Sequence, residues 1–200
     1  MNQSSLSRKG IETYRYWAEV YLNRARSRYR TLKLNALHGV RVIAPQYIGK
    51  SVRVTTDSDG WNLAGSVTIA CRGRLSDYSI IDSYGGTISI GPEFFLGRYS
   101  LLQGYGDITI GRDVMIGPHA SIIASSHIFE DVRRPMRNQG VVRENIVISD
   151  NVWIGAGARI LGGVNILAGA IVAAGAVVTS DVGNNEIVAG IPAKVLSVRR

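Results

Sequence analysis

The chain has 200 residues, of which 46% are hydrophobic and 23 are glycine, and a net charge of +8. This composition excludes a disordered chain and fits one turn-rich globular domain with a small appendage. Cys71 is the single cysteine, so no disulfide can form within one chain. We expect a reducing compartment and a small buried thiol. The sequence contains neither a transmembrane-length apolar run nor a signal-peptide core, so we expect a soluble cytoplasmic protein.

The positive charge is concentrated near the N-terminus. Residues 1–53 carry 11 Lys and Arg against two acidic residues, a net charge of +9. The remaining residues carry 12 Lys and Arg against 13 Asp and Glu, a net charge of −1. The high isoelectric point therefore does not indicate a nucleic-acid-binding surface on the main domain, and we expect no nucleic-acid partner.

Residues 1–38 are predicted to form a basic helical segment. Within residues 11–34 aromatic and apolar side chains recur three or four positions apart, which is typical of one or two amphipathic helices. These side chains are Tyr14, Trp17, Tyr21 and Leu22, followed by Arg24, Arg26, Arg28 and Arg30. Such a helix either lies on an anionic membrane surface or packs on the rest of the protein or on a neighbouring subunit.

Residues 39–200 are predicted to form a mainly β domain built from six-residue repeats. A period of six fits neither an α-helix nor a simple alternating strand, but it fits a parallel β-helix whose branched side chains point inward. The strictest run is Ile148, Ile154, Ile160, Ile166, Val172 and Val178. Earlier runs are Ile48 and Val54; Ile69, Leu75 and Ile81; Ile90, Leu96 and Leu102; and Ile110, Ile116 and Ile122. Slips of two or three residues separate these runs, and residues 55–66 are expected to bulge outward.

The repeat fails between Ile122 and Ile148. Residues 126–143 are charged, contain Pro135, and are predicted to form a long loop extruded from the repeat. A long loop inside a compact repeat is usually functional or disordered. This loop also contains His127, the best candidate for acid–base chemistry.

Motifs in and around this loop match a known family in residue type and spacing. The loop has His127, an aromatic residue two positions later, an acid at four, proline at eight and Gln-Gly at twelve and thirteen. The flanking motifs are IGPHASIIASSH (116–127), ISDNVWIGAGA (148–158), VAAGAVVTSDV (172–182) and VAGIPAKV (188–195). The chain resembles the hexapeptide-repeat acyltransferases that include maltose, galactoside and nodulation-factor acetyltransferases, and within them the bacterial polysaccharide O-acetyltransferase type. The resemblance covers residues 85–200 well, and it implies a left-handed parallel β-helix.

The resemblance implies transfer of an acetyl group from acetyl-CoA to a hydroxyl of a sugar or surface-polysaccharide precursor, which can be lipid-linked. It also implies a homotrimer with each active site between adjacent β-helices, and no metal. His127 then acts as general base, because a sugar hydroxyl has too high a pKa to attack a thioester unaided. Asp131 and Gln139 are expected to support the loop. The role of Glu130 is left open: it either supports the loop or orients the imidazole ring of His127.

The family match also assigns residues to the thioester and to coenzyme A. The backbone at Gly155 and Ala156 is expected to stabilise the oxyanion, and Trp153 to flank the acceptor and thioester. The residues expected to bind coenzyme A are Ala174, Thr179, Lys194 and Arg199. Two positions depart from the family: Ala156 and Ser126 stand where serine and asparagine are frequent. Only a main-chain role therefore carries over to Ala156.

Two other functions use the same scaffold. A zinc hydratase of the γ-carbonic-anhydrase type needs three converging imidazoles, and this chain has only His38, His119 and His127. His38 is remote from the other two in sequence, and His119 is expected to be structural. A non-catalytic β-helix scaffold is the second alternative, and it would leave the His127 loop without a role. We therefore favour the acetyltransferase.

Overall fold

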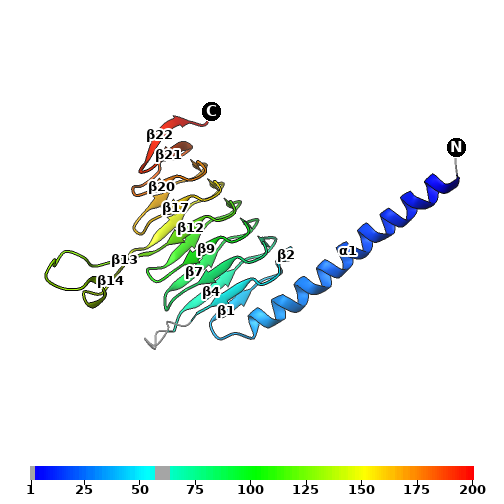
Figure 1. Cartoon of the computed structure of the whole chain (residues 1–200), viewed down its shortest axis with the longest axis horizontal. Coiled ribbons are helices and arrows are strands. Elements are labelled where there is room, and N and C mark those ends of the chain that lie inside the picture. The colour runs from blue at the N-terminus through cyan, green and yellow to red at the C-terminus, as the bar shows by residue number, and fades with distance from the viewer. Residues whose placement is uncertain (1–2, 57–63) are drawn as a thin grey trace.

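The computed structural model describes residues 3–56 and 64–200, with side chains from residue 18 onward and at Tyr16. Three parallel sheets form a triangular prism, a left-handed parallel β-helix, with α1 (Gln3–Asn35) at its first coil (Figure 1). Sheet 1 contains β1 (Val40–Val42), β4 (Ser66–Ile69), β7 (Thr87–Ile90), β10 (Ile108–Ile110), β15 (Ile146–Ile148) and β18 (Asn165–Ile166). Sheet 2 contains β2 (Tyr47–Ile48), β5 (Arg74–Leu75), β8 (Phe95–Leu96), β11 (Met115–Ile116), β16 (Trp153–Ile154), β19 (Ile171–Val172), β21 (Glu186–Gly190) and β22 (Ala193–Val198). Sheet 3 contains β3 (Arg53–Thr55), β6 (Ile80–Asp82), β9 (Leu101–Gln103), β12 (Ser121–Ile123), β17 (Arg159–Ile160) and β20 (Val177–Val178).

The predicted hexad residues form the core of the prism. Ile148, Ile154 and Ile160 are completely buried, and each lies in register with the hexad residue of the preceding coil. The inward side chains of each strand stack on their copies about 4.8 Å away, so the core is a set of apolar columns. This confirms the mainly β fold and the parallel β-helix.

The slips between hexad runs have a simple structural cause. In sheet 1 the strands β4, β7, β10 and β15 each bury two side chains, for example Ile88 and Ile90 in β7. The sheet 1 strand is therefore longer than six-residue spacing allows, and the next hexad shifts by about two residues. The predicted bulge at residues 55–66 lies largely outside the described residues.

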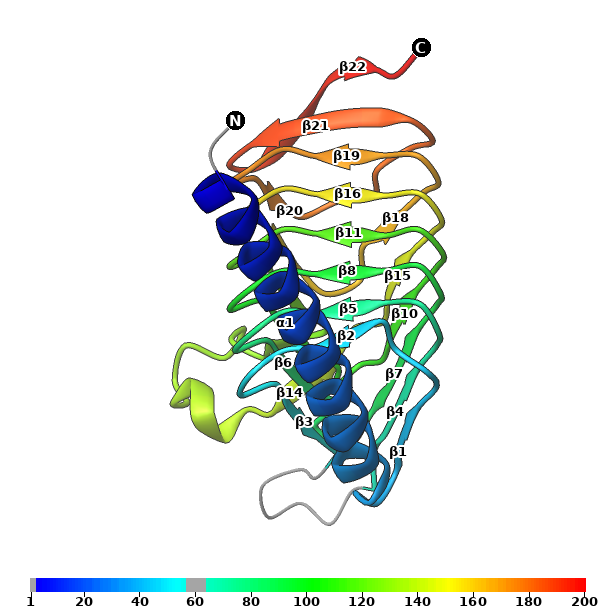
Figure 2. The ribbon, with the colours of Figure 1, turned by 90° about the vertical axis from the view of Figure 1, so that its right-hand side faces the viewer.

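The predicted N-terminal helical segment is a single helix, and it begins at Gln3, before the amphipathic stretch of residues 11–34. It diverges from the prism toward its N-terminus (Figure 1) and crosses in front of sheet 2 when viewed from that side (Figure 2). Its C-terminal part is fixed to the first coil: the Ser27 hydroxyl accepts a hydrogen bond from the Ile48 amide at 3.0 Å, and Arg30 donates to the Ile48 carbonyl. Tyr21 and Leu22 from the predicted amphipathic face are exposed, so they do not form this contact. No helix of the described residues is apolar and long enough to span a bilayer.

The C-terminal end of the prism is closed by a hairpin. Strands β21 and β22 pair antiparallel, with the chain reversing around Pro192. The repeat therefore ends where the sequence predicted. Cys71 is partly exposed at a corner between sheets 1 and 2, so the expectation of a buried thiol was wrong.

Candidate active site

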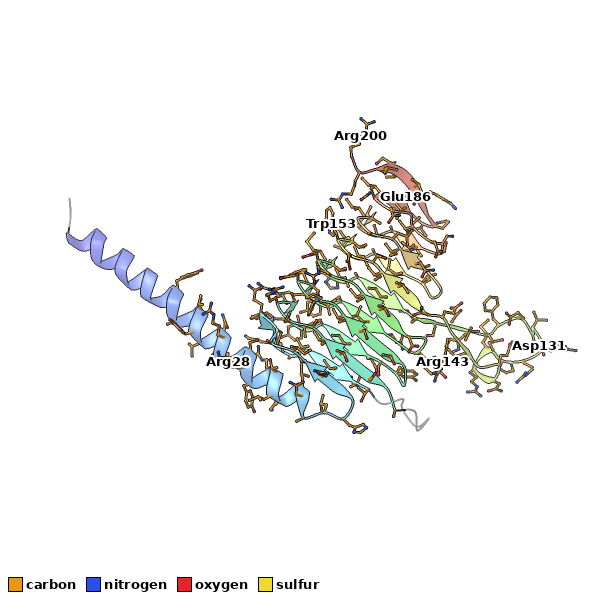
Figure 3. All side chains as sticks on the ribbon, turned by 180° about the vertical axis from the view of Figure 1, so that it is seen from behind. Arg28, Asp131, Arg143, Trp153, Glu186 and Arg200 are labelled. Carbon is orange, nitrogen blue, oxygen red and sulfur yellow. The ribbon has the colours of Figure 1, made fainter. Side chains whose placement is uncertain are left out.

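The extruded loop leaves the prism after β12 and returns at β15. Its two arms form a short antiparallel ribbon of β13 (Ser125–His127) and β14 (Val141–Arg143), in which His127 faces Val141. A single 3₁₀ turn, η1 (Met136–Asn138), lies near the tip. His127 is exposed at the outer end of β13, and the loop projects away from the prism (Figure 3). The ribbon thus presents the histidine to a molecule outside its own prism.

The side chain of Gln139 closes the loop with three hydrogen bonds. Its Oε1 accepts from the Asp131 amide at 3.1 Å, and its Nε2 donates to the carbonyls of Asp131 and Arg134, each at 2.9 Å. The carboxylate of Asp131 accepts from the Arg133 side chain at 3.1 Å and from the Arg133 amide at 3.0 Å. These two bonds from Arg133 hold the pKa of the Asp131 carboxyl below its usual value of 3.8. Both residues expected to support the loop therefore bond within it.

The acidic residues of the loop do not orient the imidazole. Glu130 accepts a hydrogen bond from the Phe129 amide, and Asp131 is engaged by Arg133. Within the part of the chain that the structure describes, no side chain forms a hydrogen bond to the His127 ring. The ring is therefore free to meet a group that this chain does not supply.

Gly155, Ala156 and Ala174 lie on one corner of the prism, between sheets 2 and 3, which we call the second corner. This corner comprises residues 49–52, 76–79, 97–100, 117–120, 155–158 and 173–176. A Cβ on Gly155 would lie 2.5 Å from the amide nitrogen of Ala174, so glycine lets the two coils approach. The amides of Ala156 and Ala174 make no hydrogen bond to an acceptor among the described residues. Two backbone donors in successive coils are thus available to a ligand.

The second corner also carries a column of stacked rings. The rings of Tyr78 and Tyr99 lie 5.1 Å apart and within 4° of parallel, and His119 stacks on Tyr99 at 5.1 Å. All three residues have positive φ at the third position of the corner, where coils 5 and 6 have Gly157 and Gly175. This stacking agrees with a structural His119. Sequence reasoning missed the column, although one aromatic residue every 20 or 21 positions could have indicated it.

Trp153 and the residues assigned to the outer end of coenzyme A lie apart from the loop. Trp153 is half exposed on sheet 2, two residues before Gly155, and it lies on the opposite side of the prism from the loop (Figure 3). Thr179 follows β20, and Lys194 is exposed on β22. Arg199 donates to the Gly169 carbonyl at 2.8 Å. Within one chain, therefore, the structure brings Trp153, Gly155 and Ala156 together but leaves His127 distant from them.

The described residues contain no cluster of three or more histidine, cysteine or acidic side chains that could hold a metal. His119 lies in the ring column on the second corner, whereas His127 lies on the loop between sheets 3 and 1. Within the described part of one chain, the imidazoles of His119 and His127 therefore do not converge on a common point.

Comparison with known proteins agrees with this fold. Residues 145–180 match the family model described as bacterial transferase hexapeptide (six repeats). A probable acetyltransferase of Mycobacterium tuberculosis is 29% identical over 73 residues, which are 36% of this chain and only 24% of that relative. The N-acyltransferase AntD of Bacillus cereus, in a mutant bound to dTDP and coenzyme A, shares the fold with a TM-score of 0.65 at 20% identity, over 80% of this chain and 84% of AntD.

Two solved structures have higher identity. A maltose O-acetyltransferase from Clostridium difficile is 27% identical, with a TM-score of 0.55 over 84% of this chain and 73% of its own. A hexapeptide-repeat acetyltransferase of Vibrio cholerae, complexed with acetyl coenzyme A, is 27% identical, with a TM-score of 0.59 over 92% of this chain and 90% of its own. The repeat and the fold make the chain similar to these hexapeptide-repeat acetyltransferases.

Proposed function

We propose that this protein transfers an acetyl group from acetyl-CoA to a hydroxyl of a sugar or surface-polysaccharide precursor. The observation that carries the proposal is the combination of an exposed histidine on a braced ribbon with two unpaired amides on the second corner. The similarity to an acetyltransferase complexed with acetyl coenzyme A supports the choice of donor. A non-catalytic scaffold would not require the braced ribbon with its exposed histidine.

In the proposed reaction His127 removes the proton of the acceptor hydroxyl as its oxygen attacks the thioester carbonyl carbon. The C=O π electrons move to the carbonyl oxygen, and the Ala156 amide, one of the two unpaired donors, stabilises the resulting oxyanion. When the tetrahedral intermediate collapses, the C–S bond breaks and the imidazolium returns its proton to the departing thiolate. Proton transfer of this kind typically contributes about 10²–10⁴ in rate.

The separation of His127 from Ala156 within one chain supports a site shared between subunits. A loop that projects from one prism can reach the second corner of an adjacent prism, whereas it cannot fold back through its own core (Figure 3). We therefore propose the homotrimer that the family resemblance implies, with His127 of one subunit facing Trp153 and Ala156 of the next.

Proline substitution tests the amide without distorting the corner. Pro118 occupies the position equivalent to Ala156 in the preceding coil, so the corner accommodates proline at this place. Ala156→Pro deletes one N–H and is expected to lower kcat by about 10²–10³, whereas Ala156→Ser keeps the N–H and should remain active. His127→Ala should abolish acceptor-dependent thiol release. Mixed trimers of Ala156→Pro and His127→Ala subunits should recover activity, because some of their interfaces combine an intact His127 with an intact Ala156.

Release is measured with hydroxyl and amino sugars and with lipid-linked glycans as acceptors. Turnover that persists in His127→Ala would refute the base, and turnover with amino sugars alone would refute O-acetylation. If wild-type protein binds no acetyl-CoA by calorimetry, the scaffold alternative is favoured.

We also propose that α1 contacts an anionic membrane, which would place a lipid-linked acceptor near the site. Tyr21, Leu22, Tyr29 and Leu32 are exposed on the part of α1 that carries the exposed arginines 24, 26 and 28. Apolar side chains flanked by cations favour an anionic bilayer surface. Co-sedimentation with phosphatidylglycerol vesicles, but not with phosphatidylcholine vesicles, is expected, and it should be lost when the three arginines are replaced by glutamine. Equal sedimentation with both vesicles, or with neither, would refute the contact.

A further inference from the structure

A cation lies over a tyrosine ring at the root of the extruded loop. Tyr84 and Tyr105 occupy equivalent places in successive coils at the corner between sheets 3 and 1, with ring centroids 5.6 Å apart in an edge-to-face arrangement. The guanidinium of Arg143, the last residue of β14, lies 4.4 Å from the centroid of the Tyr105 ring. This cation–π contact fixes the position of the charge next to the loop.

The ribbon register places Arg143 on the same face as His127. Ser125 pairs with Arg143, and His127 pairs with Val141. Because side chains alternate between the two faces of a strand, residues 125, 127, 141 and 143 share one face. Diagonal neighbours on such a face have Cα atoms roughly 7–8 Å apart. A sugar-sized acceptor in contact with the His127 imidazole is therefore within reach of the Arg143 guanidinium.

No described residue forms an ion pair with Arg143. The ion pairs of the described residues join Arg72 to Glu93, Arg98 to Asp77 and Arg133 to Asp131. The neighbouring carboxylate of Glu144 is directed away, against the backbone of Gly162 in the next coil. A guanidinium above a ring still has N–H donors directed away from the ring, and these match the paired oxygens of a carboxylate or phosphate.

We infer that Arg143, positioned by Tyr105, binds an oxyanion of the acceptor, so that the preferred acceptor is an acidic sugar or a sugar phosphate. The inference rests on the proposed role of His127, because it takes the acceptor site from that residue. Arg143 acts in recognition rather than in proton transfer. It should therefore affect acceptor affinity and KM more than kcat.

The test compares methyl β-glucuronoside, glucose 1-phosphate and methyl β-glucoside as acceptors. Wild-type protein is compared with Arg143→Gln, Arg143→Lys and Tyr105→Phe, with Arg112→Gln as a matched loss of one exposed arginine at a different corner. Thiol release gives kcat and KM, calorimetry with coenzyme A present gives binding without turnover, and size-exclusion chromatography reports assembly.

Arg143→Gln is expected to weaken binding of whichever anionic acceptor is preferred by about 10- to 100-fold and to leave the neutral glucoside unchanged. Arg143→Lys should recover part of the loss, and Tyr105→Phe and Arg112→Gln should behave as wild type. Preference for the glucuronoside identifies a carboxylate, and preference for glucose 1-phosphate identifies a phosphate.

Equal losses for neutral and anionic acceptors, dissociation of the assembly in Arg143→Gln, or no preference for anions in wild type would overturn the inference. Selective binding of an anion that depends on Arg143, but without any thiol release, would support this inference while refuting the proposed acetyl transfer.

Discussion

Gly155 and Gly157 on the second corner are both glycine, but for different reasons: one allows two coils to approach closely, and the other adopts a left-handed backbone conformation. Gly155 has no positive φ, but a Cβ at this position would lie 2.5 Å from the amide nitrogen of Ala174. Gly157 has φ +67°, and a Cβ there would meet no atom within 4 Å. Gly155→Ala therefore tests coil spacing, whereas Gly157→Asn tests tolerance of the left-handed conformation.

The expected magnitudes differ because only one substitution meets another backbone. Ordinary contact begins at 3.4 Å, so Gly155→Ala requires the fifth and sixth coils to separate by about 0.9 Å at this corner. Overpacking usually destabilises by about 1–3 kcal/mol, and we expect about 3 kcal/mol here because the Ala174 backbone cannot rotate away. Asparagine tolerates positive φ, so Gly157→Asn should change stability by less than about 1 kcal/mol.

Urea denaturation monitored by circular dichroism measures both effects, and calorimetric titration of acetyl-CoA reports the corner itself. Gly155→Ala should also weaken acetyl-CoA binding, because the displaced Ala174 amide is one of the proposed donors. Wild-type stability and affinity in Gly155→Ala would refute the argument that the coils are in backbone contact here. A larger loss in Gly157→Asn than in Gly155→Ala would show that conformation, rather than spacing, limits this corner.

Three further predictions concern the core and the loop. Ile148 is completely buried, so Ile148→Ala should destabilise the protein by about 2–5 kcal/mol and Ile148→Val by about 0.5–1.5 kcal/mol. Urea denaturation measures both. Equal losses of stability in the two variants would contradict the column packing. Gln139→Ala should lower kcat by about 10-fold and speed proteolytic cleavage of the loop, because it removes the three hydrogen bonds that close the loop. The denaturation midpoint of the prism should not change, since these bonds lie within the loop. The Asp131 carboxyl should have a pKa below 3.8 when titrated by NMR, so its ion pair with Arg133 is complete above that pH and is lost as the pH falls through the lowered pKa. Arg133→Gln should raise the pKa of Asp131. An unchanged pKa in this variant would refute Arg133 as the cause of the shift.

The fold could be predicted from the sequence because its core is a linear stack of coils, each of which contacts only its neighbours. Each inward residue such as Ile154 contacts its copies one coil away, so local spacing determines long-range packing. The irregular parts were less predictable. Two buried residues per sheet 1 strand produced the slips. The packing face of α1 depends on a hydrogen bond that Ser27 accepts and one that Arg30 donates, and no apolar periodicity reveals either.

The site was predicted unevenly for a related reason. The failure of the repeat marked the loop and His127, because an interruption is visible against a strict period. The position of Arg143 was not predictable, because it depends on the ribbon register and on a contact with Tyr105 in a distant coil. The only sequence signal for this contact is the spacing of 21 residues between Tyr84 and Tyr105. This spacing indicates that the two tyrosines occupy equivalent places in successive coils, but it does not reveal that Arg143 lies over Tyr105.

The second corner changes character along the prism in a way that matches the proposed site. In coils 2 to 4 its third position is filled by Tyr78, Tyr99 and His119, whose stacked rings cover one another. In coils 5 and 6 the same position is glycine, at Gly157 and Gly175, with open space where a side chain would lie. The backbone of this corner is therefore open to a ligand in coils 5 and 6, where the amides of Ala156 and Ala174 are unpaired. The face of His119 that does not contact Tyr99 borders this open stretch, one coil before Ala156, so the column of rings ends where the open part of the corner begins.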